Sequence, residues 1–122
     1  MALASDIVKG GFSGQSAKAI QGQVQSAVSA AGTTISDATA LTASVNVVTT
    51  WAAGAGVQLP DGEISDEVEI LNLGAGAGYV YPPSSSDRVN QLSAGSGFLL
   101  PPNTAVKCKK FTATRWIAWM SR

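Results

Sequence analysis

The stretch EVEILNLGAGAGYVYPP, residues 67–83, decides the fold class of this chain. Val68 and Ile70 alternate with glutamates, which is the pattern of a strand with one buried face and one face in water. Three glycines in five positions follow, as in a loop that cradles phosphate. In a dinucleotide site, however, such a loop leads into a helix. Here it leads into Tyr79–Tyr81 and then into two prolines, which favour a strand and its end. We therefore interpret the glycines as turn residues, tolerant of positive φ, that join strand to strand.

The same combination of β-favouring runs and turn residues recurs every 8–12 residues from Thr33 onward, a spacing typical of a sandwich or jelly roll. We predict an all-β fold: a jelly-roll-like β-sandwich of about eight strands over residues 33–122. The expected strands are Thr33–Leu41, Val45–Trp51, Gly56–Leu59, Glu67–Leu73, Gly78–Tyr81, Arg88–Gln91, Gly97–Leu99 and a final pair, Ala105–Thr112 and Arg115–Ser121.

Residues 1–32 differ from the rest in composition, with one aromatic residue and many small residues, and we predict that they form an N-terminal arm. The spacing of Ile20, Val24 and Val28 fits a helix, and their alternation with glutamines also fits a strand. Gly22 and the valines slightly favour the extended form. Because the segment has little apolar area of its own, we expect it to become ordered against the domain or a partner, and we assign Ile20, Val24 and Val28 to an interface.

The inventory of reactive side chains predicts a protein that is not an enzyme. The chain has no histidine and a single cysteine, Cys108, which argues against Cys–His catalysis and zinc sites of ordinary type. Cys108 alternates with lysines and is interpreted as a small buried hydrophobe. The acidic run from Asp61 to Glu67 has enough oxygen for calcium but lacks the spacing of an EF-hand, so a solvated turn is expected. We predict no cofactor and no metal.

The surface is expected to contact other proteins, because only 13% of residues are charged, against about 25% in a typical soluble domain. The alternative explanation for the low charge is that the chain is simply a small Ser/Thr-rich β domain. The start of the chain does not resemble a signal peptide, and no apolar run is long enough for a membrane helix, so a cytosolic site of synthesis and no membrane partner are expected.

The charges are separated along the chain, with five acids and no base from Asp61 to Glu69 and no acid after Asp87. Lys107 and Lys109 lie in the basic part. Two opposite poles could dock neighbouring copies, which would make Lys107 and Lys109 interface residues. Equally, the two segments could be adjacent strands whose charges pair across one sheet. The bases are too few to suggest nucleic acid.

Trp116 and Trp119 form the heaviest apolar cluster, WIAW. Residues three apart in an ideal strand point to opposite faces, so one ring is expected in the core and the other at the surface. We assign Trp119 to the interface.

The ordered series of short segments from Asp37 to Ala118 resembles small structural proteins of tailed-bacteriophage virions, in particular head decoration (cement) proteins. The segments are DATALTA (37–43), NVVTT (46–50), GVQLP (56–60), VEILN (68–72), VYP (80–82), VN (89–90), FLLP (98–101) and RWIA (115–118).

This resemblance implies a jelly-roll sandwich that binds the outside of an assembled capsid and stabilises it by bridging capsomers, without catalysis. Its partners would be the major capsid protein and further copies of itself, as a dimer or trimer, and its place the virion exterior after assembly in the host cytoplasm. The same pattern also resembles domains of head fibres and tail parts. The alternative function is therefore a receptor- or glycan-binding domain of such a component.

Overall fold

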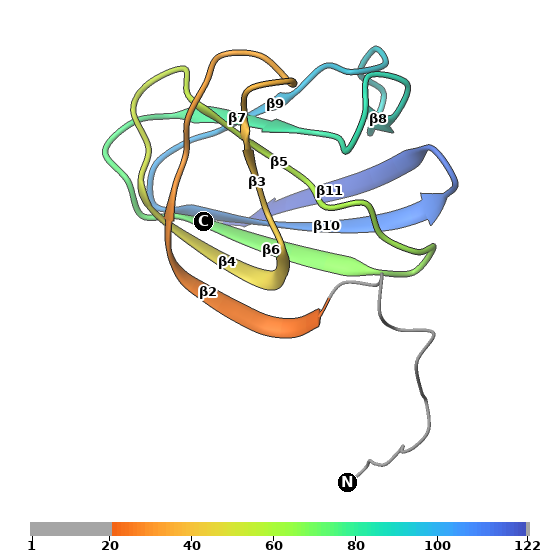
Figure 1. Cartoon of the computed structure of the whole chain (residues 1–122), viewed down its shortest axis with the longest axis horizontal. Helices are drawn as coiled ribbons and strands as arrows, with labels where there is room; N and C mark the ends of the chain where they lie inside the picture. Colours follow the sequence, from red (N-terminus) through yellow and green to blue (C-terminus); the bar gives the residue numbers. More distant parts are fainter. Residues whose placement is uncertain (1–20, 122) are drawn as a thin grey trace, which may run out of the picture.

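The computed structural model describes residues 21–121, which form two β-sheets stacked face to face (Figure 1). One sheet has six strands, in the order β2 (Gln21–Ser29), β4 (Ala43–Thr50), β6 (Glu67–Asn72), β10 (Thr104–Thr112), β11 (Arg115–Ser121) and β8 (Arg88–Val89). The other has four, in the order β3 (Thr39–Ala40), β5 (Gly56–Gln58), β7 (Gly78–Tyr81) and β9 (Phe98–Leu100). Over this range no helix is long and apolar enough to cross a membrane.

The chain changes sheet at every connection from β2 to β10, and the first three strands of each sheet run parallel to one another. β2, β4 and β6 pair in parallel, as do β3, β5 and β7 in the other sheet. Antiparallel pairing joins β7 to β9, β6 to β10 and β10 to β11. A parallel pair needs a connection that leaves the sheet and returns, and here the opposite sheet provides it.

The all-β prediction is confirmed, but this topology is that of a β-solenoid. A jelly roll is built from antiparallel strands, so the expected jelly-roll connections are corrected. The alternation of apolar and polar residues reports which face of a strand is buried. It does not report the direction of the neighbouring strand, which is why the sequence left this open.

The core lies between the two sheets and is almost entirely aliphatic, with two tryptophans as its largest side chains. Trp51 closes it at the end of β4, and Trp116 of β11 is fully buried within it. The six-stranded sheet contributes Val28, Val48, Val68, Ile70, Val106 and Cys108, and the four-stranded sheet contributes Val57, Val80, Phe98 and Leu100. This single core positions the outward faces of both sheets.

The expected arm is in part a strand of the domain. β2 pairs in parallel with β4, and Val28 is buried in the core, so the six-stranded sheet begins before the predicted boundary at residue 32. The extended alternative is the one that this segment adopts. The earlier part of the arm, including Ile20, lies outside the described residues.

The first expected strand, Thr33–Leu41, is reduced to the two residues of β3. Asp37 is the cause: its Oδ1 accepts hydrogen bonds from the backbone N–H groups of Thr33 and Thr34, at 3.1 and 2.8 Å, and from the Thr34 hydroxyl at 2.8 Å. These bonds, above all the one from the Thr34 amide, lower the pKa of the exposed Asp37 carboxyl. An Asp that satisfies local amides in this way favours a turn over a strand.

The glycine loop of residues 73–77 joins β6 to β7, as predicted, but its glycines are required for another reason. Positive φ occurs at Gly32, Gly54 and Gly95, outside this loop. A Cβ at Gly74 or Gly76 would instead lie 2.6 or 2.5 Å from the backbone N of Trp51 or Ala53, in the previous coil. Close stacking of two corners, with Gly76 N–H bonded to Trp51 O at 2.8 Å, therefore explains these glycines.

A repeated sequence motif, absent from the predictions made above, marks the coils. The segments AGAG (53–56), AGAG (75–78) and AGSG (94–97) lead into β5, β7 and β9 of the four-stranded sheet, respectively. The first or second residue after each of these strands is a proline. The last glycine of each segment lies against an aromatic ring: Gly56 and Gly97 against Tyr81, and Gly78 against Trp51. Such self-similarity is the sequence signature of a solenoid.

Candidate binding surface

The outward face of the six-stranded sheet carries a continuous row of side chains across five strands. The register aligns Val24, Val45, Glu69, Lys107 and Trp119, from β2 to β11. Residues next to them along the strands, such as Ile70 and Val106, are buried, so this row points away from the core. Val24 is 64% exposed and Trp119 is 51% exposed. We call this row, with the two flanking rows described next, the outer face.

The two flanking rows also consist of charged and apolar side chains. On one side the register aligns Glu67, Lys109 and Ile117, and on the other it aligns Val47, Leu71 and Ala105. The outer face thus has charges at its centre, on β6 and β10, and apolar side chains on both flanks.

The central charges pair within the chain. Lys107 Nζ lies 3.6 Å from Glu67 Oε1 and 3.7 Å from Glu69 Oε2, and Lys109 Nζ lies 3.5 Å from Glu67 Oε2. The structure therefore favours the cross-strand alternative for the acidic and basic segments over two separate poles. All four side chains are partly exposed, so these pairs contribute at most about 1 kcal/mol each.

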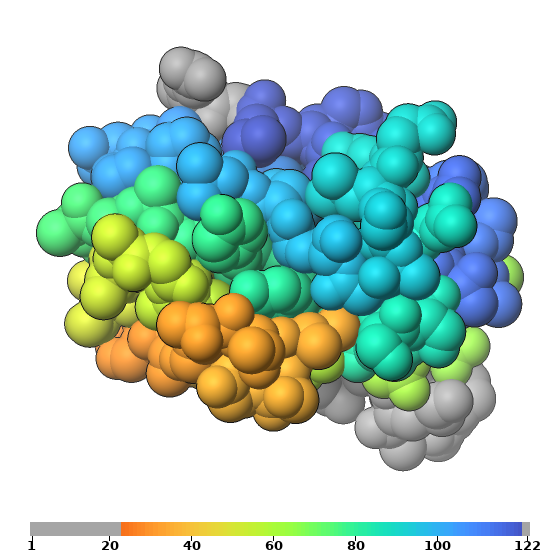
Figure 2. Space-filling view, turned by 90° about the horizontal axis from the view of Figure 1, so that it is seen from above, coloured from red at the N-terminus to blue at the C-terminus, as the bar shows by residue number. Residues whose placement is uncertain are grey.

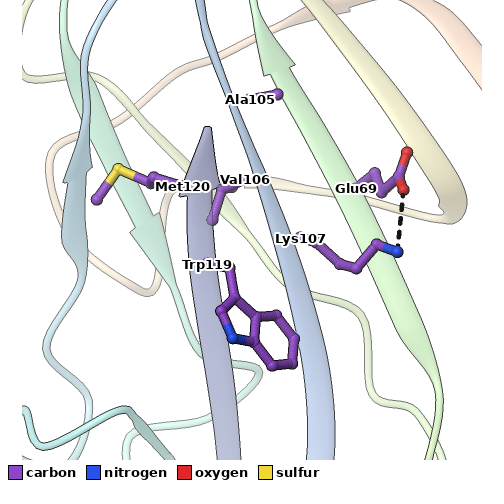
Figure 3. Close-up of a pocket in the computed structure, with 6 residues that line it drawn as sticks. All are labelled: Glu69, Ala105, Val106, Lys107, Trp119 and Met120. Atoms are coloured by element: carbon purple, nitrogen blue, oxygen red, sulfur yellow. Dashed lines mark ion pairs between the residues drawn. The ribbon is translucent and has the colours of Figure 1, made fainter. Parts of the chain in front are cut away.

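Trp119 borders a shallow hollow of about 390 Å³ at the β11 side of the outer face (Figure 3). Its lining comes from three adjacent strands and consists of Glu69, Ala105, Val106, Lys107, Trp119 and Met120. Figure 3 shows Lys107 reaching toward Glu69, while Met120 extends to the opposite side of β11. An exposed indole next to a hollow is typical of a protein-binding surface.

The structure brings together on the outer face four of the residues that the sequence suggested for an interface. Val24, Lys107 and Trp119 share one row, and Lys109 lies in the next. Val28 does not belong to the surface, because its side chain is 8% exposed and packs in the core. Bulges in the β2–β4 pairing make the face of a β2 residue unpredictable from simple alternation.

One lysine of the basic segment is absent from the outer face. Lys110 is buried, and its ammonium group donates a hydrogen bond to Gly62 O at 2.7 Å. Asp87 is buried nearby, and desolvation raises the pKa of its carboxyl, although the positive charge of Lys110 opposes this shift. The hydrogen bond from the Lys110 ammonium group ties the loop that contains Gly62 to β10.

The remaining chemical groups also have structural roles. Burial raises the pKa of the Cys108 thiol to about 12, which removes it as a nucleophile near neutral pH. In the acidic turn, Asp66 Oδ2 accepts a hydrogen bond from Glu63 N–H at 2.7 Å. Among residues 21–121, no group of three or more His, Cys, Asp or Glu side chains is placed to hold a metal ion.

The outer side of the four-stranded sheet is a second exposed surface (Figure 2), and the sequences of β3, β5, β7 and β9 contain no charged residue. Tyr79 is 38% exposed, and its ring centroid lies 6.2 Å from that of Tyr81, with the planes tilted by 32°. Leu99 of β9 is paired with Tyr79 and is also exposed. This small aromatic surface is a second candidate binding site, separate from the outer face.

Comparison of the chain with protein-family models, with curated proteins and with solved structures finds no match. The likeness to virion decoration proteins therefore remains a prediction made from short segments.

Proposed function

We propose that this protein is a non-catalytic structural component of a tailed-bacteriophage virion, which binds the outside of the assembled capsid as a homo-oligomer and stabilises it by bridging capsomers. The partners are the major capsid protein and further copies of the chain. A protein that binds only the assembled lattice stabilises that lattice through mass action.

The observation that carries this proposal is the outer face. It presents an exposed tryptophan and valines on either side of partly exposed ion pairs, on a sheet rather than on loops. Exposed aromatic side chains such as Trp119 are enriched in protein-binding surfaces. The resemblance of the ordered segments to those of decoration proteins is the reason for choosing a capsid as the assembly.

The test is the number of copies of the chain in purified virus particles, measured by quantitative mass spectrometry against the major capsid protein. A decoration protein is present in hundreds of copies, in a fixed ratio to the capsid protein. A few tens of copies or fewer would contradict capsid decoration and favour a fibre or tail component.

The second candidate, a receptor- or glycan-binding domain of a fibre or tail component, is favoured by Tyr79 and Tyr81. Neighbouring tyrosine rings on an uncharged sheet offer an apolar surface with polar hydroxyls, although the Tyr81 hydroxyl already donates to Thr33 O at 3.1 Å. A glycan array distinguishes the candidates: a fibre domain should bind specific glycans and lose them in Tyr79→Ala, whereas Trp119→Ala should bind as the native chain does.

A further inference from the structure

We propose that the outer face binds the same face of a second copy of this chain, across a two-fold axis that runs parallel to the strands between β6 and β10. The inference deepens the proposed function by naming the partner of this surface, and it rests on that function only in taking the face to bind protein.

The order of residues in the central row makes the face complementary to itself. The proposed axis exchanges β6 with β10 and β4 with β11. Glu69 then lies opposite Lys107 of the partner subunit, and Lys107 opposite Glu69 of the partner subunit. Val45 lies opposite Trp119 of the partner subunit, beside the hollow of about 390 Å³ that Trp119 borders.

The residues of the flanking rows are also complementary across this axis. Glu67 lies opposite Lys109 of the partner subunit, and Leu71 lies opposite Ala105 of the partner subunit, so charges meet opposite charges and apolar groups meet apolar groups. Rotation about an axis along the strands also keeps the two sets of strands aligned, which is one of the two preferred ways for sheets to pack.

Other two-fold arrangements of the same face are disfavoured by its charges. An axis perpendicular to the strands would place β6 on β6 and β10 on β10, with glutamates against glutamates and lysines against lysines. Like-charge contacts of this kind are costly and suppress wrong pairings. An axis shifted to lie between β4 and β6 would instead place Glu69 against Val45 of the partner subunit.

The charges remain free to take part in such a contact. Their distances of 3.5–3.7 Å within the chain are longer than those of good charge-assisted hydrogen bonds, about 2.7–2.9 Å. The partly exposed carboxylates and ammonium groups can therefore share their attraction with a second copy.

The size of the face predicts a weak dimer. Five strands about 4.8 Å apart, each contributing about six residues at roughly 3.3 Å, give a flat area on the order of 400 Å² per subunit. The total, on the order of 800 Å² before side-chain relief is counted, lies below the about 1,200 Å² of stable specific interfaces and in the range of weak, transient ones. We expect association that depends on concentration in the micromolar range.

The experiment is sedimentation velocity of the full chain over a wide range of concentrations at low salt, with four charge variants. Lys107→Glu makes the centre of the row acidic, and Glu69→Lys makes it basic, so each should weaken self-association by at least about tenfold. Asp61→Lys, in the loop before β6, changes the net charge as much as Glu69→Lys does and should leave the dimer intact. The double swap Glu69→Lys/Lys107→Glu restores complementarity and should restore the dimer.

Mixing provides the decisive result: Lys107→Glu and Glu69→Lys, each monomeric alone, should form a heterodimer together. The proposal is overturned if the native chain is monomeric at the highest concentration, if Lys107→Glu associates as well as the native chain, or if the mixture stays monomeric. These measurements use the isolated chain, so their failure leaves the copy number in particles as an independent test of the proposed function.

Discussion

Single glycines at the corners of the solenoid determine how closely its coils stack. Gly78 begins β7 directly under the Trp51 indole, whose N–H donates to Ala55 O at 2.7 Å. A methyl group at this position would displace both the ring and the carbonyl, so Gly78→Ala is expected to lower the free energy of unfolding by about 2 kcal/mol or more. Gly54→Ala, where space is open but φ is +84°, should cost only about 1 kcal/mol. Urea denaturation measures both, and equal losses would contradict the crowding argument.

The buried Cys108 thiol makes stability depend on pH in the alkaline range. Burial raises its pKa from 9.0 to about 12, so the folded state holds the neutral thiol more strongly than the unfolded state does. The stabilising contribution is complete below pH 9 and is lost as the pH rises from about 9 toward 12. We expect a thiol reagent such as DTNB to leave the native protein unlabelled at pH 8 and to label it on unfolding. Rapid native labelling would show that the thiol is accessible.

At the scale of elements, β2 tests whether the arm belongs to the cooperative fold. Val28 and Val24 lie four residues apart on this strand, the first buried and the second 64% exposed. Val28→Ala should lower the free energy of unfolding by about 1.5–3 kcal/mol, because it removes buried methyl groups and leaves a cavity, while Val24→Ala should change it by less than about 0.5 kcal/mol. Thermal or urea unfolding measures the difference. A neutral Val28→Ala would mean that β2 is only loosely attached.

The elements themselves were largely predictable, and their connections were not. Gly78–Tyr81 and Arg115–Ser121 have the predicted bounds, because alternation and flanking turn residues define a strand locally. The burial of Val28 could not be predicted from the sequence, because bulges in the β2–β4 pairing break the alternation of faces along β2. The pairing of Lys107 with Glu67 and Glu69 required knowing that β6 and β10 are neighbours, which is information that no local pattern contains. The AGAG and AGSG segments were the signal that could have identified the coils.

At the scale of the whole molecule, the alternation of the chain between the sheets should make unfolding a single transition. Long solenoids can open from one end, because each coil contacts only its neighbours. In this chain the strands of the smaller sheet have two to four residues, and their apolar sides, including Val57 and Val80, are covered only by the larger sheet. Such short strands cannot persist alone.

We therefore expect the slowest-exchanging backbone amides of β6 and of β7 to exchange with the same free energy, equal to that of global unfolding. Native-state hydrogen exchange followed by NMR at increasing denaturant measures both sets in one sample. Amides of β7 that exchange with a clearly lower free energy than those of β6 would show that the four-stranded sheet opens separately. In that case the outer face on the six-stranded sheet could stay intact while the tyrosine surface is lost, and the two surfaces would belong to independent units.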